Sequence, residues 1–89
     1  MCAAAFCPTG TTIFVNGTTE EMTGLDAVCG AVRVAGGGAG GYIAFGDSMV
    51  TASNSDMPIG ASEVATFRPP PGATHIASTT TVRVTVGQL

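Results

Sequence analysis

The feature that most constrains the fold of this chain is an alternation of apolar and polar residues near its C-terminus. The stretch TVRVTVG places Val82, Val84 and Val86 on one side of the chain and polar side chains on the other. Successive side chains of a β-strand point to opposite faces, so this period of two predicts a strand with one buried face. We therefore expect these valines to contribute to a core.

A second segment with the same alternation begins at Val28. Val28, Val32 and Val34 share one side of the chain. Arg33 points away from that side, and Gly30 indicates a bulge within the strand. Further strands are expected where β-branched and aromatic residues are dense, at 11–17, 42–47, 63–68 and 74–78.

Proline- and glycine-rich segments separate the expected strands. The prolines at 69–71 have no N–H to donate, so the strand before them must leave its ladder there. The window 18–28 holds at most one helical turn, because its cap signal is weak and Gly24 interrupts it. Strands without intervening helices predict an all-β fold, namely a small antiparallel β-sandwich or partly open barrel of six to seven strands. The 89 residues allow one domain, in which residues 1–10 belong to the core fold or form an extended arm.

The glycine-rich run after the second expected strand contains a spacing typical of phosphate-binding loops. Gly36, Gly38 and Gly41 satisfy G-x-G-x-x-G. A dinucleotide fingerprint requires a helix after these glycines, whereas the residues at 42–47 have a strand pattern. The other common phosphate loop requires a lysine, and this sequence contains none. We therefore predict a flexible hairpin connection here and no bound cofactor.

Charge is scarce in this sequence and argues against two classes of partner. Charged residues make up 10% of the chain, against roughly 25% in a typical domain. Three arginines oppose six carboxylates, for a net charge of −3. Binding to nucleic acid or to an anionic membrane surface depends on clustered cations, so we expect neither partner. No segment approaches the roughly 20 apolar residues that would span a bilayer.

The side chains that could support catalysis are few and scattered. His75 is the only histidine, and a Cys29–His75 pair could serve as nucleophile and base, but nothing in the sequence brings the two together. The simpler expectation is that His75 lies on one face of a short strand. Glu20 and Glu21 are adjacent and would point apart in a strand.

The remaining polar candidates have ordinary structural explanations. Asp47 and Asp56 lie in expected loops, where aspartate commonly caps turns. No acidic cluster has the spacing of a calcium loop. Asn16-Gly17-Thr18 matches the glycosylation sequon, which matters only in a secretory setting. We predict no catalytic, cofactor-binding or metal-binding residue, and we expect that the protein is not an enzyme.

The cysteines, Cys2, Cys7 and Cys29, are odd in number and lack a C-x-x-C spacing. We expect them to be reduced and partly buried, with a Cys2–Cys7 bridge as the alternative if the protein matures outside a reducing cytosol. The N-terminal MCAAAFCP has no basic region, and its apolar run stops at Pro8. It therefore does not have the pattern of a secretory leader.

The segment MPIGASEVATFRPPPGATHIASTTTVRVTVGQL, residues 57–89, resembles the C-terminal part of small virion proteins of tailed bacteriophages. In these proteins a strand runs into R-x-P-P-G-A-T-H-I-A, and a strand of the type T-x-x-V-x-V-T-x-G closes the chain. The pattern V-x-x-G-G-x-x-G-Y-I-A-F-G at residues 34–46 also resembles them, so that the likeness covers residues 31–89. The resemblance implies a non-enzymatic virion subunit and carries over no catalytic residues.

The resemblance implies a capsid decoration or cement protein, made in the host cytoplasm and located on the capsid surface of the virion. Its partners would be the major capsid protein and further copies of itself, as a dimer or trimer. Independently, a small sheet protein with few charges has little to protect its strand edges, so we expect partner chains to cover them. The alternatives are a head–tail joining, tail or fibre-associated virion subunit, and a carbohydrate-binding or adhesin-like β-sandwich module.

Overall fold

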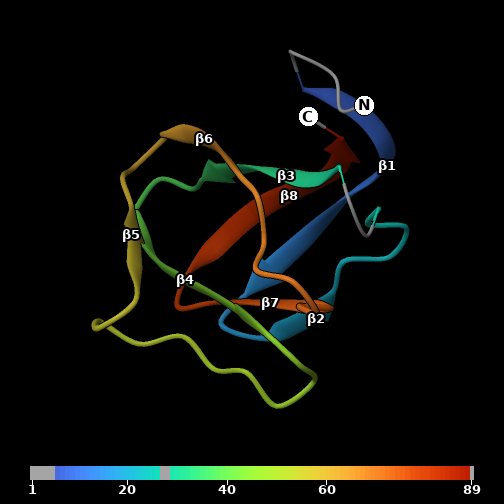
Figure 1. Cartoon of the computed structure of the whole chain (residues 1–89). Helices are drawn as coiled ribbons and strands as arrows, with labels where there is room; N and C mark the ends of the chain where they lie inside the picture. The colour runs from blue at the N-terminus through green and yellow to red at the C-terminus, as the bar shows by residue number, and fades with distance from the viewer. Residues whose placement is uncertain (1–5, 27–28, 89) are drawn as a thin grey trace.

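The computed structural model describes residues 6–26 and 29–88, and this part of the chain contains eight strands and no helix (Figure 1). The prediction of an all-β fold is therefore confirmed. The strands are β1 (Cys7–Asn16), β2 (Thr19–Glu21), β3 (Gly30–Gly36), β4 (Gly41–Gly46), β5 (Met57–Ile59), β6 (Val64–Phe67), β7 (His75–Ser78) and β8 (Thr81–Gln88).

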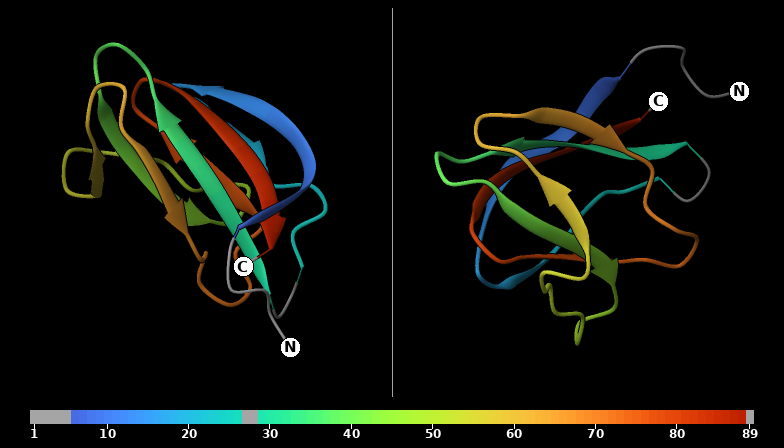
Figure 2. Two further views of the ribbon diagram at one scale, coloured as in Figure 1. Left: turned by 90° about the horizontal axis from the view of Figure 1, so that it is seen from above. Right: turned by 90° about the vertical axis from the view of Figure 1, so that its left-hand side faces the viewer.

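The strands form two four-stranded sheets that pack face to face as a β-sandwich and do not close into a barrel (Figure 2). Sheet A has the order β1-β8-β3-β6, and sheet B has the order β2-β7-β4-β5. Every neighbouring pair in both sheets is antiparallel. The central strands of both sheets therefore include the last two strands of the chain, β7 and β8.

The core lies between the sheets and consists mainly of β-branched side chains. Val84 of β8 pairs with Val34 of β3, and both side chains are completely buried. Each fully buried valine or isoleucine contributes roughly 1.5–3 kcal/mol of hydrophobic stabilisation. The alternation predicted for both strands is confirmed. The buried core cluster comprises Val15, Met22, Val32, Val34, Ile43, Ile59, Ile76, Val82, Val84 and Val86.

The glycine-rich segment after β3 does not form the predicted hairpin, because β3 and β4 belong to different sheets. The chain instead crosses from sheet A to sheet B. Its backbone passes close to the β5–β6 connection and to the start of β8. A Cβ atom at Gly36 would collide with the carbonyl oxygen of Gly60, and one at Gly37 would lie 2.6 Å from the carbonyl oxygen of Thr81. Gly40 has a φ of 67°, which favours glycine. These glycines are required by close backbone approach.

Two short strands were not predicted. β2 lies in the window expected as a helical turn, and β5 begins inside an expected loop. Each has three residues and lies at an edge of sheet B, where Pro58 of β5 is tolerated. β2 pairs with β7 and β5 pairs with β4, and these partners determine where the short strands form. The local sequence therefore carries little signal for a strand.

The expected bulge at Gly30 is wrong. β3 pairs regularly with β8 from Gly30 to Gly36, and the irregularity lies in β1, between Pro8 and Thr12. Residues 7–10, considered above as core fold or arm, are the first residues of β1. Val28, which was expected to share the face of the β3 valines, lies outside the described residues.

Candidate interaction surface

The outer face of sheet B is covered by the protein's own chain. The β4–β5 connection, residues 47–56, folds back over it, and the Thr19 hydroxyl donates a hydrogen bond of 2.6 Å to the carbonyl oxygen of Val50. A Cβ atom at Gly46 would lie 2.9 Å from Cβ of Val50, so the connection packs directly against β4. Ala77, which pairs with Thr19 on β7, is only 2% exposed. The connection therefore covers the middle of the outer face of sheet B.

The outer face of sheet A, by contrast, is covered by described residues at one end, where Phe6 lies against Gly87 and Arg33, and is open over the rest. Cross-strand pairing aligns Phe14, Arg83, Ala35 and Val64 in one row across all four strands. Phe14 is 61% exposed and Val64 is 60% exposed, although both are large and apolar. We call this surface the open face; a second aligned row completes it, so that its residues are Thr12, Phe14, Arg33, Ala35, Val64, Thr66, Arg83 and Thr85.

Two arginines on the open face are held along the sheet by neighbouring side chains. The guanidinium carbon of Arg83 lies 5.4 Å from the ring centroid of Phe14, and that of Arg33 lies 4.7 Å from the ring centroid of Phe6. Nε of Arg33 also donates a hydrogen bond of 3.3 Å to the Thr66 hydroxyl. Such cation–π contacts contribute about 0.5–1 kcal/mol each at exposed sites. The two cations are therefore partly ordered before any partner arrives.

The charge of the open face is opposite in sign to that of the whole chain. It carries two of the three arginines and no carboxylate, in a protein with a net charge of −3. The six carboxylates lie elsewhere, at Glu20, Glu21, Asp26, Asp47, Asp56 and Glu63. Four of these carboxylates lie on β2 of sheet B or in the β4–β5 connection, so positive and negative charge are unevenly distributed over the molecule, which can orient a charged partner.

The centre of the open face is a shallow hollow with a volume of about 400 Å³. Ala35 has the smallest side chain of the first row, and the larger side chains of Phe14, Val64, Arg33 and Arg83 surround it. The hollow thus has two apolar walls and two cationic ones. It fits a protruding apolar side chain accompanied by a carboxylate.

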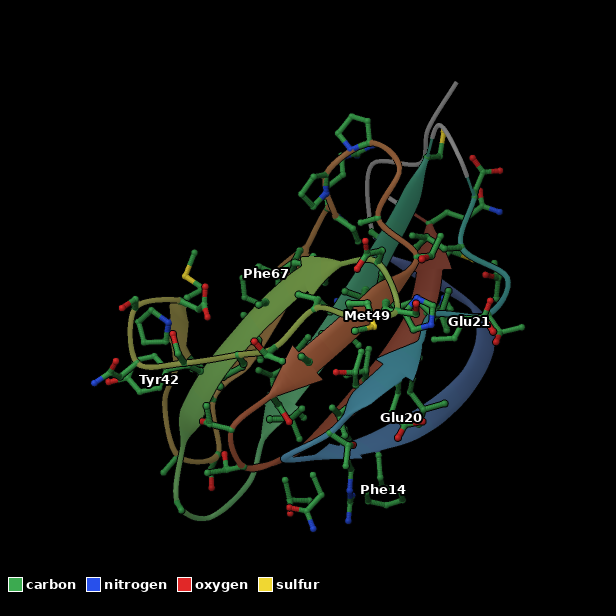
Figure 3. All side chains as sticks on the ribbon, turned by 90° about the horizontal axis from the view of Figure 1, so that it is seen from below. Phe14, Glu20, Glu21, Tyr42, Met49 and Phe67 are labelled. Carbon is green, nitrogen blue, oxygen red and sulfur yellow. The ribbon has the colours of Figure 1, made fainter. Side chains whose placement is uncertain are left out.

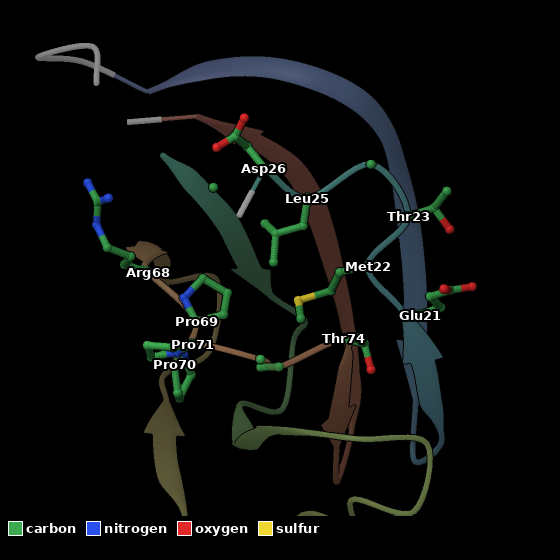
Figure 4. A pocket seen from close by; sticks show the side chains of 14 residues that line it. Glu21, Met22, Thr23, Leu25, Asp26, Arg68, Pro69, Pro70, Pro71 and Thr74 are labelled. Carbon is green, nitrogen blue, oxygen red and sulfur yellow. The ribbon is translucent and has the colours of Figure 1, made fainter. Parts of the chain in front are cut away.

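A second hollow, of about 520 Å³, lies at one end of the sandwich (Figure 4). It is formed where the β2–β3 connection meets the β6–β7 connection, and the Met22 N–H donates to the carbonyl oxygen of Thr74 at 2.9 Å. Figure 4 shows Met22, Leu25 and Pro69 pointing toward one another inside it. Its walls are mainly apolar, and Glu21, Asp26 and Arg68 also line it.

The structure gives the residues considered as nucleophile and base other contacts. Cys29 is disulfide-bonded, so its sulfur is not a free thiolate, and the expectation that it is reduced is wrong. Cys7 is free, as expected, but exposed where partial burial was expected, and its free state contradicts the alternative Cys2–Cys7 bridge; Cys2 itself lies outside the described residues. His75 begins β7, and its Nδ1 lies 2.7 Å from the Thr74 hydroxyl. Its predicted place on a short strand is confirmed.

The aspartates predicted to cap turns do so. Oδ1 of Asp47 accepts a hydrogen bond of 2.9 Å from the Met49 N–H, and Oδ2 of Asp56 accepts one of 2.7 Å from the Ser53 N–H. Glu20 and Glu21 both lie on β2 and are exposed. Within residues 6–26 and 29–88, no three His, Cys, Asp or Glu side chains gather where they could hold a metal ion.

No protein family, curated protein or solved structure matches this chain. The described residues also include no helix that is long and apolar enough to cross a bilayer. The open face was missed by sequence reasoning, although the three consecutive apolar residues Ile13, Phe14 and Val15 require one of them to point outward from a strand.

Proposed function

We propose that this protein is a structural subunit of a bacteriophage virion, a capsid decoration or cement protein that binds the major capsid protein shell and stabilises the head. The proposal combines the resemblance of residues 31–89 to small virion proteins with the distribution of apolar surface on the molecule. It assigns the chain no reaction to catalyse. Its work would be to hold other protein subunits together.

The observation that carries the proposal is the number of large apolar side chains left in solvent. Phe14, Met49, Met57 and Val64 are each more than half exposed, in a chain with only 10% charged residues. Phe14 and Val64 lie on the open face, whereas Met49 and Met57 lie in the β4–β5 connection and in β5. Exposed apolar surface of this kind usually marks protein contacts, and charge depletion marks their centres. Two such regions suit a subunit that contacts more than one neighbour.

A decoration protein of this kind would stabilise the head by mass action. A protein that binds only the assembled shell stabilises it by RT ln(1 + [L]/Kd) for each site. Because the sites repeat with the symmetry of the shell, small contributions add over the whole particle. Binding therefore needs specific contact surfaces and no reactive centre.

The experiment that tests this proposal is the stoichiometry of the protein in purified source particles. Quantitative mass spectrometry should find it in a fixed ratio to the major capsid protein, and electron microscopy should show its density repeated at shell symmetry positions. A copy number that matches a single ring would instead indicate a head–tail subunit. Its absence from the particles would overturn the proposal and favour a binding module of the adhesin type.

A further inference from the structure

The turn that presents Met49 is fixed at both ends. The Val50 N–H donates to the carbonyl oxygen of Asp47 at 3.1 Å, and the Asp47 carboxylate accepts from the Met49 N–H at 2.9 Å. The hydroxyl of Thr19 holds the Val50 carbonyl from sheet B. Met49 is nevertheless 82% exposed, the highest value among the large apolar side chains of the described residues. The turn thus presents one apolar side chain, beside a carboxylate, on an ordered base.

We propose that the Met49 turn of a second copy of this protein occupies the hollow of the open face. Met49 would lie between Phe14 and Val64, and Asp47 of the second copy would face Arg33 and Arg83. This inference deepens the proposed function, on which it rests, because it makes the two contact regions partners of one another in neighbouring copies. The apolar side chain and the carboxylate of the turn match the two kinds of wall around the hollow.

The two contact surfaces lie on opposite sheets, which determines how the copies are arranged. Figure 3 shows Met49 over β7 of sheet B, whereas Phe14 belongs to β1 of sheet A. A contact between two different surfaces is heterologous, so copies would add head to tail, as a ring if the rotation closes and as a row if it does not.

Charge argues against the symmetric alternative, in which two open faces pack together. That arrangement would bring Arg33 and Arg83 of both copies into one interface with no carboxylate from the open faces. Juxtaposed like charges at an interface are costly, whereas the head-to-tail contact pairs them with Asp47. Charge complementarity within one sequence therefore favours a second copy bound head to tail.

Sedimentation velocity of the full-length protein over a range of concentrations and salt tests this contact. The unmodified chain should associate reversibly, and more weakly at high salt because the charged part is screened. Met49→Lys should weaken association at least about tenfold, since it removes the apolar insert and faces two arginines with a third cation. Met57→Lys is the matched control, with the same change at another exposed methionine, and should leave association unchanged.

Mixing two variants, each altered in one of the two surfaces, distinguishes this contact from a general loss of self-association. Arg83→Glu should also weaken association at least about tenfold on its own. An equimolar mixture of Met49→Lys and Arg83→Glu should form dimers again, because the unchanged Met49 turn of the Arg83→Glu chain meets the unchanged open face of the Met49→Lys chain. Both changes are at exposed positions, so circular dichroism should show that both variants are folded. An open-face homodimer would be insensitive to Met49→Lys.

The outcomes of this test and of the virion test are separate. A chain that stays monomeric at high concentration, or a mixture that fails to associate, overturns the head-to-tail contact even if the protein is abundant in virions. Association that follows the expected charge pattern supports the contact even if the protein is absent from virions, and in that case it is the proposed function that fails.

Discussion

The two outer faces of this sandwich differ in how far the chain covers them, although both sheets have four antiparallel strands. Sheet B uses residues 47–56 to cover its own outer face and buries Ala77 almost completely. Sheet A leaves Phe14 and Val64 in solvent on its two edge strands, with two arginines held along the central strands between them. The difference teaches that the chain of a small sandwich with one core can cover one outer face itself, while the other outer face stays exposed for a partner. Stability should therefore depend on the covered face, and association on the open one.

The largest expected effect comes from the same substitution at the middle of each face. Ala77→Glu should lower the free energy of unfolding by about 3 kcal/mol or more, because the carboxylate must be buried beneath the connection or displace it. Ala35→Glu should change it by no more than about 0.5 kcal/mol, since the new side chain extends into the hollow beside Arg33 and Arg83. Urea unfolding measures both. Equal losses of stability in the two variants would contradict the conclusion that one face is covered and the other is open.

A glycine substitution in the crossover between the two sheets sharpens the comparison, because this crossover joins sheet A to sheet B. Gly36→Ala should cost about 2 kcal/mol, since its Cβ atom would collide with the Gly60 carbonyl and the backbone must shift. Gly38→Ala is the control, with nothing within 4 Å of its Cβ atom, and should be neutral or slightly stabilising. Thermal unfolding distinguishes the two. If both variants lose stability equally, the close packing of this crossover is wrong.

A smaller effect is expected from removing one hydroxyl on each face. Thr19→Val removes the hydrogen bond to the Val50 carbonyl and should cost about 1 kcal/mol. Hydrogen exchange should then accelerate in residues 47–56, because the connection loses one of its anchors. Thr12→Val removes the 2.8 Å hydrogen bond to Thr85 on the open face, where water replaces it at almost no cost. Unchanged exchange in Thr19→Val would show that the cover is held in another way.

The smallest effect on stability is expected at Val64. Val64→Thr keeps the β-branched shape on an exposed edge strand, so the free energy of unfolding should change by no more than about 0.5 kcal/mol. Self-association should nevertheless weaken severalfold, because one apolar wall of the hollow becomes polar. Urea unfolding and sedimentation velocity are measured on the same sample. A clear loss of stability without a change in association would assign Val64 to the monomer's core.

The sequence predicts the strands that bury an alternating face but not how they are connected. Val82, Val84 and Val86 have the period of two because water lies on one side of β8 and the core on the other. β2 and β5 have too few residues to show a period, and their partners determine them. The glycine-rich segment was interpreted as a hairpin because its local signal does not reveal which sheet the next strand joins.

The candidate site was hidden from the sequence for a related reason. Phe14, Arg83, Ala35 and Val64 come from four strands, and only the register places them in one row. Their exposure depends on whether another segment covers them, which no local pattern encodes. The caps at Asp47 and Asp56 were predictable because they depend on neighbours two or three residues away.

The strand order has a consequence for how the chain is made. β8 lies between β1 and β3, and β7 lies between β2 and β4. Each sheet therefore lacks one of its two central strands until β7 and β8 have been synthesised. During synthesis the earlier strands emerge with few partners to pair with, and pairing between distant segments is slow. A nascent chain that stops before β7 would therefore leave unpaired edges open to aggregation. Folding can be completed only once β8 has left the ribosome.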